Sequence, residues 1–259
     1  MHPYLSIAKR AAEEAGKIIQ RGHRDLEKLQ VVEKGRGDFV SNIDRQAEET
    51  IRSIIKEKFP NHKLVGEEYG EEELDSPHQW IIDPLDGTSN FLHGQKHCAV
   101  SIAYAKNGVL ETGIIFNPLT QDIFTASKGE GAIFNGRKIR CNNQKDPKAA
   151  IVVNGYKARF PDEAAIQVQI SGKVLAVFGD LRRSGSAALD CAYTACGFYD
   201  AYYEKGPHSW DIAAGILIAQ EAGCLVSDFV GGKDMFKREE IVISNPNLHP
   251  VLLDLIKED

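Results

Sequence analysis

The sequence predicts an α/β (α+β) fold in which helices and strands alternate in layers. Several segments repeat apolar residues at alternating spacings of three and four, which is typical of amphipathic helices. Short runs rich in β-branched and aromatic residues end at Gly, Asn or Pro, as buried strands do. Both kinds of segment alternate in each half of the chain without an internal repeat, and this order favours a layered α/β architecture.

The first half, residues 1–145, is expected to begin with a helix, a hairpin and a second helix. Apolar residues at helical spacing run from Tyr4 to Ile18 and again from Ile43 to Ile54. Between them, VVEKGRGDFV has apolar ends around two glycines, which predicts two strands and a turn. The segments HKLVGEE and WIIDPLDGT are predicted strands, and the region from residue 97 to 136 is predicted to add several more.

The second half, residues 146–259, is expected to alternate strands and helices. The predicted strands are AAIVVNG, VLAVFG at 174–179 and CLVSDF. The predicted helices run from Asp162 to Ile170, through SGSAALDCAYTACG with Gly197 at its end, and through WDIAAGILIAQEAG. The join near residue 145 is polar but is not a linker, so we expect one unit over 1–259 with two halves.

Composition excludes several classes of protein. The formal net charge is -6 and no run of Lys or Arg occurs, so we expect no nucleic-acid partner. The five cysteines are scattered without a C-x-x-C pair, which predicts reduced thiols rather than a zinc site or a disulfide framework. The N-terminus has no apolar signal region, and the apolar stretch IAAGILIA is far shorter than the roughly 18 residues of a membrane span. We therefore expect a cytoplasmic protein with no membrane partner.

Three segments place carboxylates next to apolar runs. Glu67 and Glu68 follow KLVG, and Asp211 precedes IAAGILIA. Asp83 directly follows WII, and Asp86 lies three residues further on. Ligands of open α/β sheets gather beyond the carboxyl ends of strands, so these acids are expected to converge. Their mutual repulsion calls for protons or hard cations, and a donor set made only of oxygens favours Mg²⁺ over zinc.

The stretch between Asp83 and Thr88 adds two further features. Pro84 removes a backbone N–H and fixes the turn, which leaves carbonyl groups such as that of Leu85 free to face a metal. Gly87 and Thr88 offer N–H groups where a helix begins, an arrangement that binds phosphate. Each feature alone also fits a capped turn, a solvated acid pair or a first-turn helix acid, and their joint occurrence is what favours a site.

These motifs resemble the inositol monophosphatases, within the wider superfamily of Mg²⁺-dependent, lithium-sensitive sugar phosphatases. The matching stretches are GEE at 66–68, WIIDPLDGTSNFLHG at 80–94 and WDIAAG at 210–215, with FVSNID at 39–44 and LRRSGSAALD at 181–190 in support. The resemblance implies a layered αβαβα sandwich of the sugar phosphatase type that forms a homodimer. It also implies an enzyme, a phosphoric monoester hydrolase that uses two or three Mg²⁺ per site and acts on a sugar or polyol phosphate, here myo-inositol monophosphate.

Carried over by position, the resemblance assigns roles to individual residues. Glu67, Asp83 and the Leu85 carbonyl would hold the first Mg²⁺, and Asp83, Asp86 and Asp211 the second, with Asp83 as the bridge. Asp44, Thr88 and Glu67 are the catalytic candidates, because Thr88 with Asp44 would orient the attacking water. Glu68 would lie near a third, weaker metal, and Lys34 would add positive charge behind the ligands, although each also fits a solvated surface residue.

The resemblance also implies a substrate-binding set: Asp86, Gly87, Thr88, Arg182, Gly185, Ser186, Ala187, Glu204 and Asp211. Glu204 would accept hydrogen bonds from sugar hydroxyls, and it would equally fit a surface glutamate. The sequence does not show which of Arg182 and Arg183 contacts the substrate: one would approach it, while the other would pair across the dimer interface. No histidine is expected to take part in the chemistry, because a metal-bound water already supplies the nucleophile.

Three alternatives stay open. Fructose-1,6-bisphosphatases and nucleotide 3'-phosphatases share the metal motifs but need further basic residues or an adenine pocket, and the sequence has no such insertion. The third possibility, from a different class, is an interaction protein on the same fold, with or without catalysis. All of the acids in the metal motifs are present, which favours an enzyme.

Overall fold

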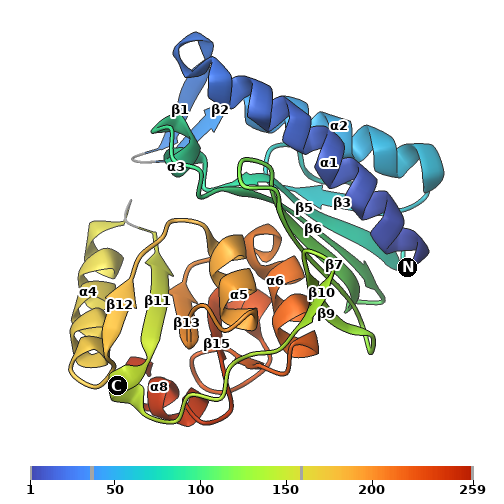
Figure 1. The fold of residues 1–259 in the computed structure, drawn as a ribbon. Coiled ribbons are helices and arrows are strands. Elements are labelled where there is room, and N and C mark those ends of the chain that lie inside the picture. Colours follow the sequence, from blue (N-terminus) through green and yellow to red (C-terminus); the bar gives the residue numbers. More distant parts are fainter. Residues whose placement is uncertain (1, 36–37, 158–159, 258–259) are drawn as a thin grey trace.

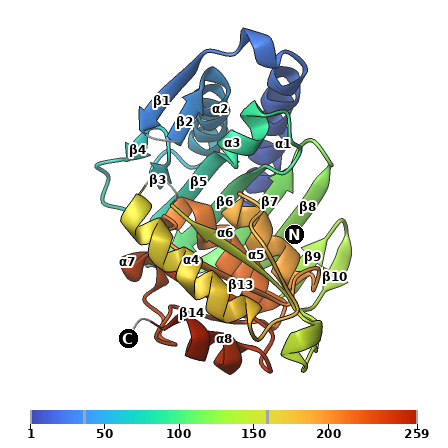
Figure 2. The ribbon, with the colours of Figure 1, turned by 90° about the vertical axis from the view of Figure 1, so that its left-hand side faces the viewer.

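The structure, a computed structural model, describes residues 2–35, 38–157 and 160–257, and within this part it leaves the side chains of 34–40 undescribed. Its helices and sheets stack in five alternating layers (Figures 1 and 2). Helices α1 (Pro3–Arg24) and α2 (Asn42–Lys58) form the first layer and an eight-stranded sheet the second. Helices α5 (Ala187–Ala195) and α6 (Ser209–Glu221) form the third layer, a five-stranded sheet the fourth, and α4 (Pro161–Leu175) and α8 (His249–Ile256) the fifth. The predicted layered αβαβα fold is confirmed.

The first layer follows from two amphipathic sequences. Helix α1 (Pro3–Arg24) buries one stripe that includes Ala8, Ala15 and Ile19, and α2 (Asn42–Lys58) buries Ile51 in the same cluster. Strands β1 (Val31–Gly35) and β2 (Asp38–Ser41) form the hairpin between them. Both helices lie on strands of the large sheet, so burial of their apolar stripes fixes the layer.

The eight-stranded sheet has the order β10-β9-β8-β7-β6-β5-β3-β4. Its strands are β3 (Lys63–Gly66), β4 (Gly70–Glu71), β5 (His78–Asp86), β6 (Ala99–Lys106), β7 (Val109–Asn117), β8 (Asp122–Ser127), β9 (Gly131–Phe134) and β10 (Arg137–Ile139). Strands β3 and β5 are parallel, with Gly66 opposite Ile82. Both strands therefore end at the same edge, and the acids that follow them meet there.

The five-stranded sheet has the order β12-β11-β13-β15-β14. Its strands are β11 (Ile151–Tyr156), β12 (Asp180–Arg182), β13 (Ala201–Lys205), β14 (Leu225–Ser227) and β15 (Glu240–Ser244). The other helices are α3 (Thr88–Leu92), α4 (Pro161–Leu175), α5 (Ala187–Ala195), α6 (Ser209–Glu221), α7 (Met235–Arg238) and α8 (His249–Ile256), with 3₁₀ turns at Leu26–Lys28 and Pro147–Ala149.

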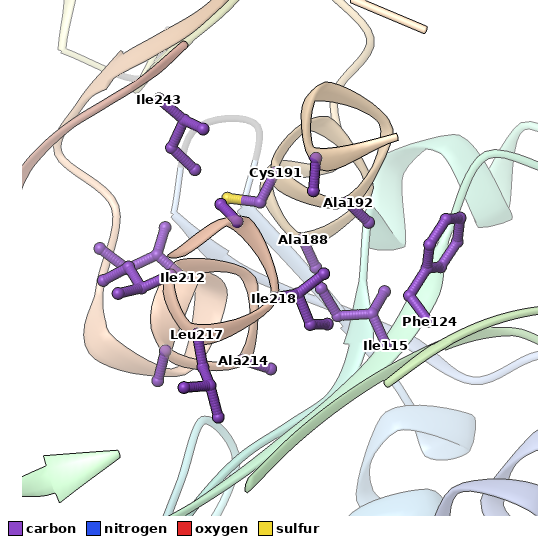
Figure 3. Close-up of a cluster of buried hydrophobic side chains, with 14 of the residues drawn as sticks. Ile115, Phe124, Ala188, Cys191, Ala192, Ile212, Ala214, Leu217, Ile218 and Ile243 are labelled. Atoms are coloured by element: carbon purple, nitrogen blue, oxygen red, sulfur yellow. The ribbon is translucent and has the colours of Figure 1, made fainter. Parts of the chain in front are cut away.

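Helices α5 and α6 fill the space between the two sheets (Figure 3). Ile115 and Phe124 of the large sheet and Ile243 of the small sheet belong to the same buried cluster as these helices. Gly215 of α6 faces Cys191 of α5, and a Cβ at Gly215 would overlap the cysteine side chain. The small residues of both helices thus permit the close approach that places their N-termini side by side.

One predicted strand is wrong. Residues 174–179, VLAVFG, do not form a strand: α4 continues to Leu175, a turn follows, and β12 begins at Asp180. Ile170, Val174 and Phe178 are all buried in the cluster under α4 and α8. Their spacing of four is helical, and this periodicity overrides the β-branched composition that suggested a strand.

No helix within the described residues is both long enough and apolar enough to span a membrane.

Candidate active site

The centre of the candidate site is the bulged end of β5. The four residues from Asp83 to Asp86 lie opposite three residues of β6, and Pro84 within this bulge has no N–H for the ladder. Asp83 is 1% exposed, and its Oδ1 accepts a hydrogen bond from the Leu85 N–H at 2.9 Å. The Leu85 carbonyl oxygen lies 3.0 Å from the Thr88 hydroxyl oxygen. Glu67 lies beside this strand because its N–H donates to Ile82 O at 3.2 Å.

Two acids from distant segments complete the group. Asp86 Oδ2 accepts from the Ser186 hydroxyl and from the Ala188 N–H, the latter at 2.8 Å, so the end of β5 is tied to the start of α5. Asp211 lies in the first turn of α6, and its Oδ2 accepts from the His208 N–H at 2.6 Å. A first-turn acid is favoured there by the helix dipole. The two helix starts therefore hold Asp86 and Asp211 against the large sheet.

These carboxylates converge, because Asp86 and Asp211 line the same cavity and Asp83 lies at the same bulge as Asp86. Burial raises the pKa of Asp83 well above its usual value, and the charges of Glu67, Asp86 and Asp211 raise it further. Burial likewise raises the pKa of Asp211, with Asp86 and Glu67 adding to the shift. Burial raises the pKa of Asp86 to about 6, although hydrogen bonds from Ser186 and Ala188 oppose the shift. Several buried acids that repel one another form an environment that a cation would stabilise.

The donor set fits magnesium in its chemistry. Its members offer only oxygens, and the described hydrogen bonds of Asp83 and Asp211 each use one carboxylate oxygen. Within the described ranges, no three His, Cys, Asp or Glu side chains already stand in a geometry that would hold an ion.

Asp44 and Thr88 form a second feature beside the bulge. Asp44 caps α2, with its Oδ2 accepting from the Ser41 N–H at 2.9 Å and from the Ser41 hydroxyl at 2.6 Å. Its Oδ1 accepts from the Thr88 hydroxyl at 2.9 Å. Burial raises the pKa of Asp44, while the hydrogen bonds from Ser41 and Thr88 lower it. The pair expected from the sequence is thus in contact.

Gly87 is the N-cap residue of α3, and its backbone lies in the left-handed region with φ of 90°. A Cβ there would lie 2.9 Å from the carbonyl oxygen of His97, so the turn requires glycine. Glu68 is half-buried, and its N–H donates to Glu48 Oε2 at 2.7 Å. The side chain of Lys34 lies outside the part of the chain that the structure describes.

A polar cavity of about 190 Å³ adjoins the acids. It is lined by Asp86, Gly155, Tyr156, Arg183, Gly185, Ser186, Ala187, Asp190, Glu204 and Asp211. Glu204 Oε2 accepts from the Tyr202 hydroxyl at 2.5 Å, and burial raises the pKa of Glu204 to about 7. A Cβ at Gly155 of the neighbouring strand β11 would overlap the Glu204 carboxylate, so only glycine at this position leaves room for the Glu204 side chain.

The two arginines take different positions. Arg183 lines the cavity, donates from Nη2 to Tyr156 O at 3.1 Å and lies over the Tyr156 ring at 4.6 Å. Arg182 is exposed and pairs with Asp180 at 2.5 Å. The structure therefore puts Arg183, and not the Arg182 of the predicted substrate set, on the cavity wall.

Three residues near the site were not predicted from the sequence. Tyr202 holds Glu204 from the same face of β13, and the two-residue spacing on a strand is a signal that would have found it. Asp190 accepts from the Ser184 hydroxyl at 2.5 Å and is 1% exposed; an acid inside a small-residue helix is a comparable signal. Asn90 donates to His97 O and Ser184 O, which no sequence pattern indicates.

The layered fold agrees with the comparisons to known proteins. The sequence model of the inositol monophosphatase family matches residues 1–259, and the chain belongs to this family. It is 40% identical over 260 residues to Nus factor SuhB of Escherichia coli (strain K12), a match that covers 100% of this chain and 97% of that protein. Two solved structures are similar. Extragenic suppressor protein suhB from Bartonella henselae has a TM-score of 0.95 and 37% identity, with 98% of each chain covered. The Thermotoga maritima IMPase has a TM-score of 0.87 and 30% identity, with 97% of this chain and 94% of that chain covered.

Proposed function

We propose that this chain is a Mg²⁺-dependent phosphatase that hydrolyses a phosphate monoester of a polyol, with myo-inositol monophosphate as the substrate. The observation that carries the proposal is the meeting of Asp83, Asp86 and Asp211 beside a polar cavity that contains Glu204. Family membership supports a phosphatase, and the acids and the cavity support a metal-bound phosphate next to a polyol.

Glu67, Asp83 and the Leu85 carbonyl would hold one Mg²⁺, and Asp83, Asp86 and Asp211 a second. Glu68 would lie near a third. When bound, the metal neutralises phosphate charge and activates a water as the nucleophile.

The chain's own groups would orient the reaction. The Thr88 hydroxyl and the Asp44 carboxylate would align a water, because their 2.9 Å hydrogen bond fixes both side chains. The Gly87 and Thr88 N–H groups at the start of α3 would hold phosphate oxygens. No side-chain nucleophile is needed, since phosphoryl transfer depends on alignment and charge more than on covalent help.

Polyol recognition would fall to the cavity. Glu204 would accept hydrogen bonds from substrate hydroxyls, while Gly185, Ser186 and Ala187 would form the adjoining wall. Arg183 would supply the positive charge of this wall in place of Arg182. A cytoplasmic homodimer and lithium inhibition are part of the proposal and come from the family resemblance alone.

Phosphate release from a panel of substrates tests the proposal. The purified chain is assayed with Mg²⁺ and with EDTA on inositol-1-phosphate, fructose-1,6-bisphosphate and adenosine 3',5'-bisphosphate. We expect release only with Mg²⁺ and the highest kcat/KM on inositol-1-phosphate. A tenfold preference for either rival, about 1.4 kcal/mol, would overturn the substrate assignment, and activity that survives EDTA would overturn metal dependence.

A second candidate function is favoured by the SuhB relatives, which are named Nus factors at 40% identity over the whole chain. We propose that this chain also binds a protein partner. A pull-down from lysate with the wild type and with Asp83→Asn tests this. A partner captured equally by both supports a function that does not need catalysis, whereas capture of none contradicts it.

A further inference from the structure

We propose that Glu48 of α2 is a positioning residue for the metal site, because its buried carboxylate holds the turn that presents Glu67 and Glu68. The inference rests on the proposed function, since it concerns the affinity of that site for Mg²⁺. Glu48 lies one helical turn after Asp44, so a single helix would control the orientation of the water and the position of a ligand.

The contacts of Glu48 are with the backbone of this turn. Glu48 is 0% exposed, its Oε2 accepts from the Glu68 N–H at 2.7 Å, and its Oε1 accepts from the Tyr69 N–H at 3.3 Å. A carboxylate that accepts two successive N–H groups fixes the direction of the chain between them. Glu67 immediately precedes this anchored segment.

Gly66, on the other side of Glu67, shows how closely the carboxylate approaches the turn. A Cβ at Gly66 would overlap the Glu48 carboxylate, so glycine at this position is what admits it. The Gly66 backbone is also fixed by its place in β3 beside β5. Glu67 is therefore held between a strand end and the two N–H groups bound by Glu48.

Arg52 binds both the Glu48 carboxylate and the backbone of the turn that Glu48 holds. Its Nε donates to Glu48 Oε1 at 2.7 Å, and its Nη2 donates to Gly70 O at 2.6 Å. The guanidinium thus links the buried carboxylate to the far end of the same turn, and it offsets the burial of the Glu48 charge. An ion pair that served only to join α2 to the sheet would not require contacts to this series of backbone groups.

The test compares Glu48→Gln with Glu49→Gln, a matched control on the exposed side of the same helix. In Glu48→Gln one carboxylate oxygen becomes an amide NH₂, so one of the accepted hydrogen bonds is lost. Three quantities are measured: amide hydrogen exchange in the peptide covering residues 66–71 of the metal-free protein, Mg²⁺ affinity by calorimetry without substrate, and kcat with the Mg²⁺ concentration for half-maximal activity.

We expect faster exchange of the 66–71 peptide in Glu48→Gln and a Mg²⁺ affinity weakened by about tenfold, a typical loss when the support of a metal ligand is removed. We also expect kcat at saturating Mg²⁺ to stay within about twofold of wild type, because excess metal restores the occupied site. Glu49→Gln should match the wild type in all three measurements.

A folded Glu48→Gln protein with wild-type Mg²⁺ affinity would overturn the role of Glu48 and leave the proposed function intact. A wild type that binds no Mg²⁺ would overturn both. If Glu48→Gln does not fold, Arg52→Lys replaces it: Lys keeps a charge near Glu48 but cannot reach Glu48 and Gly70 O together. Weakened Mg²⁺ binding in Arg52→Lys supports the inference, and unchanged binding overturns it.

Discussion

The Thr88 hydroxyl donates to the Asp44 carboxylate at 2.9 Å and lies 3.0 Å from the Leu85 carbonyl oxygen. This one side chain therefore joins the N-terminus of α2 to the bulged end of β5. A hydroxyl has a single proton to donate, so its two acceptors compete for it. Thr88 would therefore contact both Asp44, which would help to orient the water, and the Leu85 carbonyl, which would bind a metal.

We predict that Thr88→Val lowers kcat by about 100-fold, the lower end of the range for a positioned proton-transfer group. Val keeps the shape of Thr but cannot donate to Asp44. Thr88→Ser keeps the hydroxyl and should retain most of the activity. Steady-state kinetics at saturating Mg²⁺ test this, and equal activity of the Val and Ser variants would contradict the role of the hydroxyl.

Asp83→Asn should reduce turnover by at least about 1,000-fold, or roughly 4 kcal/mol of transition-state stabilisation. Asp83 would bridge two metals, and an amide oxygen is a weaker ligand than a carboxylate. The variant should fold, because it removes one of several mutually repelling charges. Its melting temperature in EDTA should be no lower than that of wild type, and the exposed Asp75→Asn change serves as control.

Glu204→Gln should raise KM for inositol-1-phosphate by about tenfold, or 1.4 kcal/mol, because Glu204 would bind hydroxyl groups of the polyol. 4-Nitrophenyl phosphate has no such hydroxyls, and its KM should not change. The comparison of the two substrates separates polyol recognition from damage to the site. Equal effects on both substrates would show that Glu204 supports the metal or the fold instead.

The buried acids also predict how stability varies with pH. Burial raises the pKa of Glu204 from its ordinary 4.5 to about 7, so folding takes up a proton in this range. The stability that Glu204 contributes is complete below pH 4.5 and is lost as the pH rises through about 7. Burial lowers the pKa values of His62, His97 and His249, so their contribution makes stability rise with pH, opposite to that of Glu204. The contribution of Glu204 is therefore measured as a difference between wild type and a Glu204 variant.

The measurement for Glu204 is the free energy of unfolding of wild type and Glu204→Gln in EDTA at several pH values. Relative to wild type, the variant should gain stability as the pH rises from about 4.5 to 7, by at most about 3 kcal/mol. A difference between the two proteins that does not vary with pH would contradict the raised pKa.

Two glycine substitutions, one in the middle layer and one on an outer helix, test the packing of the helices. Gly215→Ala should destabilise the protein by about 1–3 kcal/mol, because its Cβ would overlap Cys191. Gly172→Ala lies in α4 with nothing near the added Cβ and should stabilise by about 0.5–1 kcal/mol. Chemical denaturation of both variants is the test, and opposite signs are expected. Destabilisation by Gly172→Ala would contradict the packing described here.

Much of this fold could be predicted because its signals are local. The stripes of α1 and α2 and the Gly- or Asn-bounded strands of the large sheet are periodic patterns in the sequence. The segment 174–179 was mistaken for a strand because a short apolar run fits either element, and its burial at helical spacing depends on α8.

The candidate site could likewise be predicted only where its signals are local. The acids could be located because they stand at the ends of apolar runs, and parallel pairing of β3 with β5 brings two of these ends together. Glu48 escaped prediction, and Arg183 could not be chosen over Arg182, because the contacts of both residues depend on how elements pack. A sequence pattern shows which residue follows a strand, but not which side chain on another helix binds the turn beyond it.

Crystals grown with Mn²⁺ and inorganic phosphate test the central claim most directly, because Mn²⁺ takes the place of Mg²⁺ and its anomalous signal locates each ion. We predict two ions that share Asp83, with Asp86 and Asp211 on one and Glu67 and the Leu85 carbonyl on the other. Carboxylates turned away from one another, with no anomalous peak between them, would contradict it.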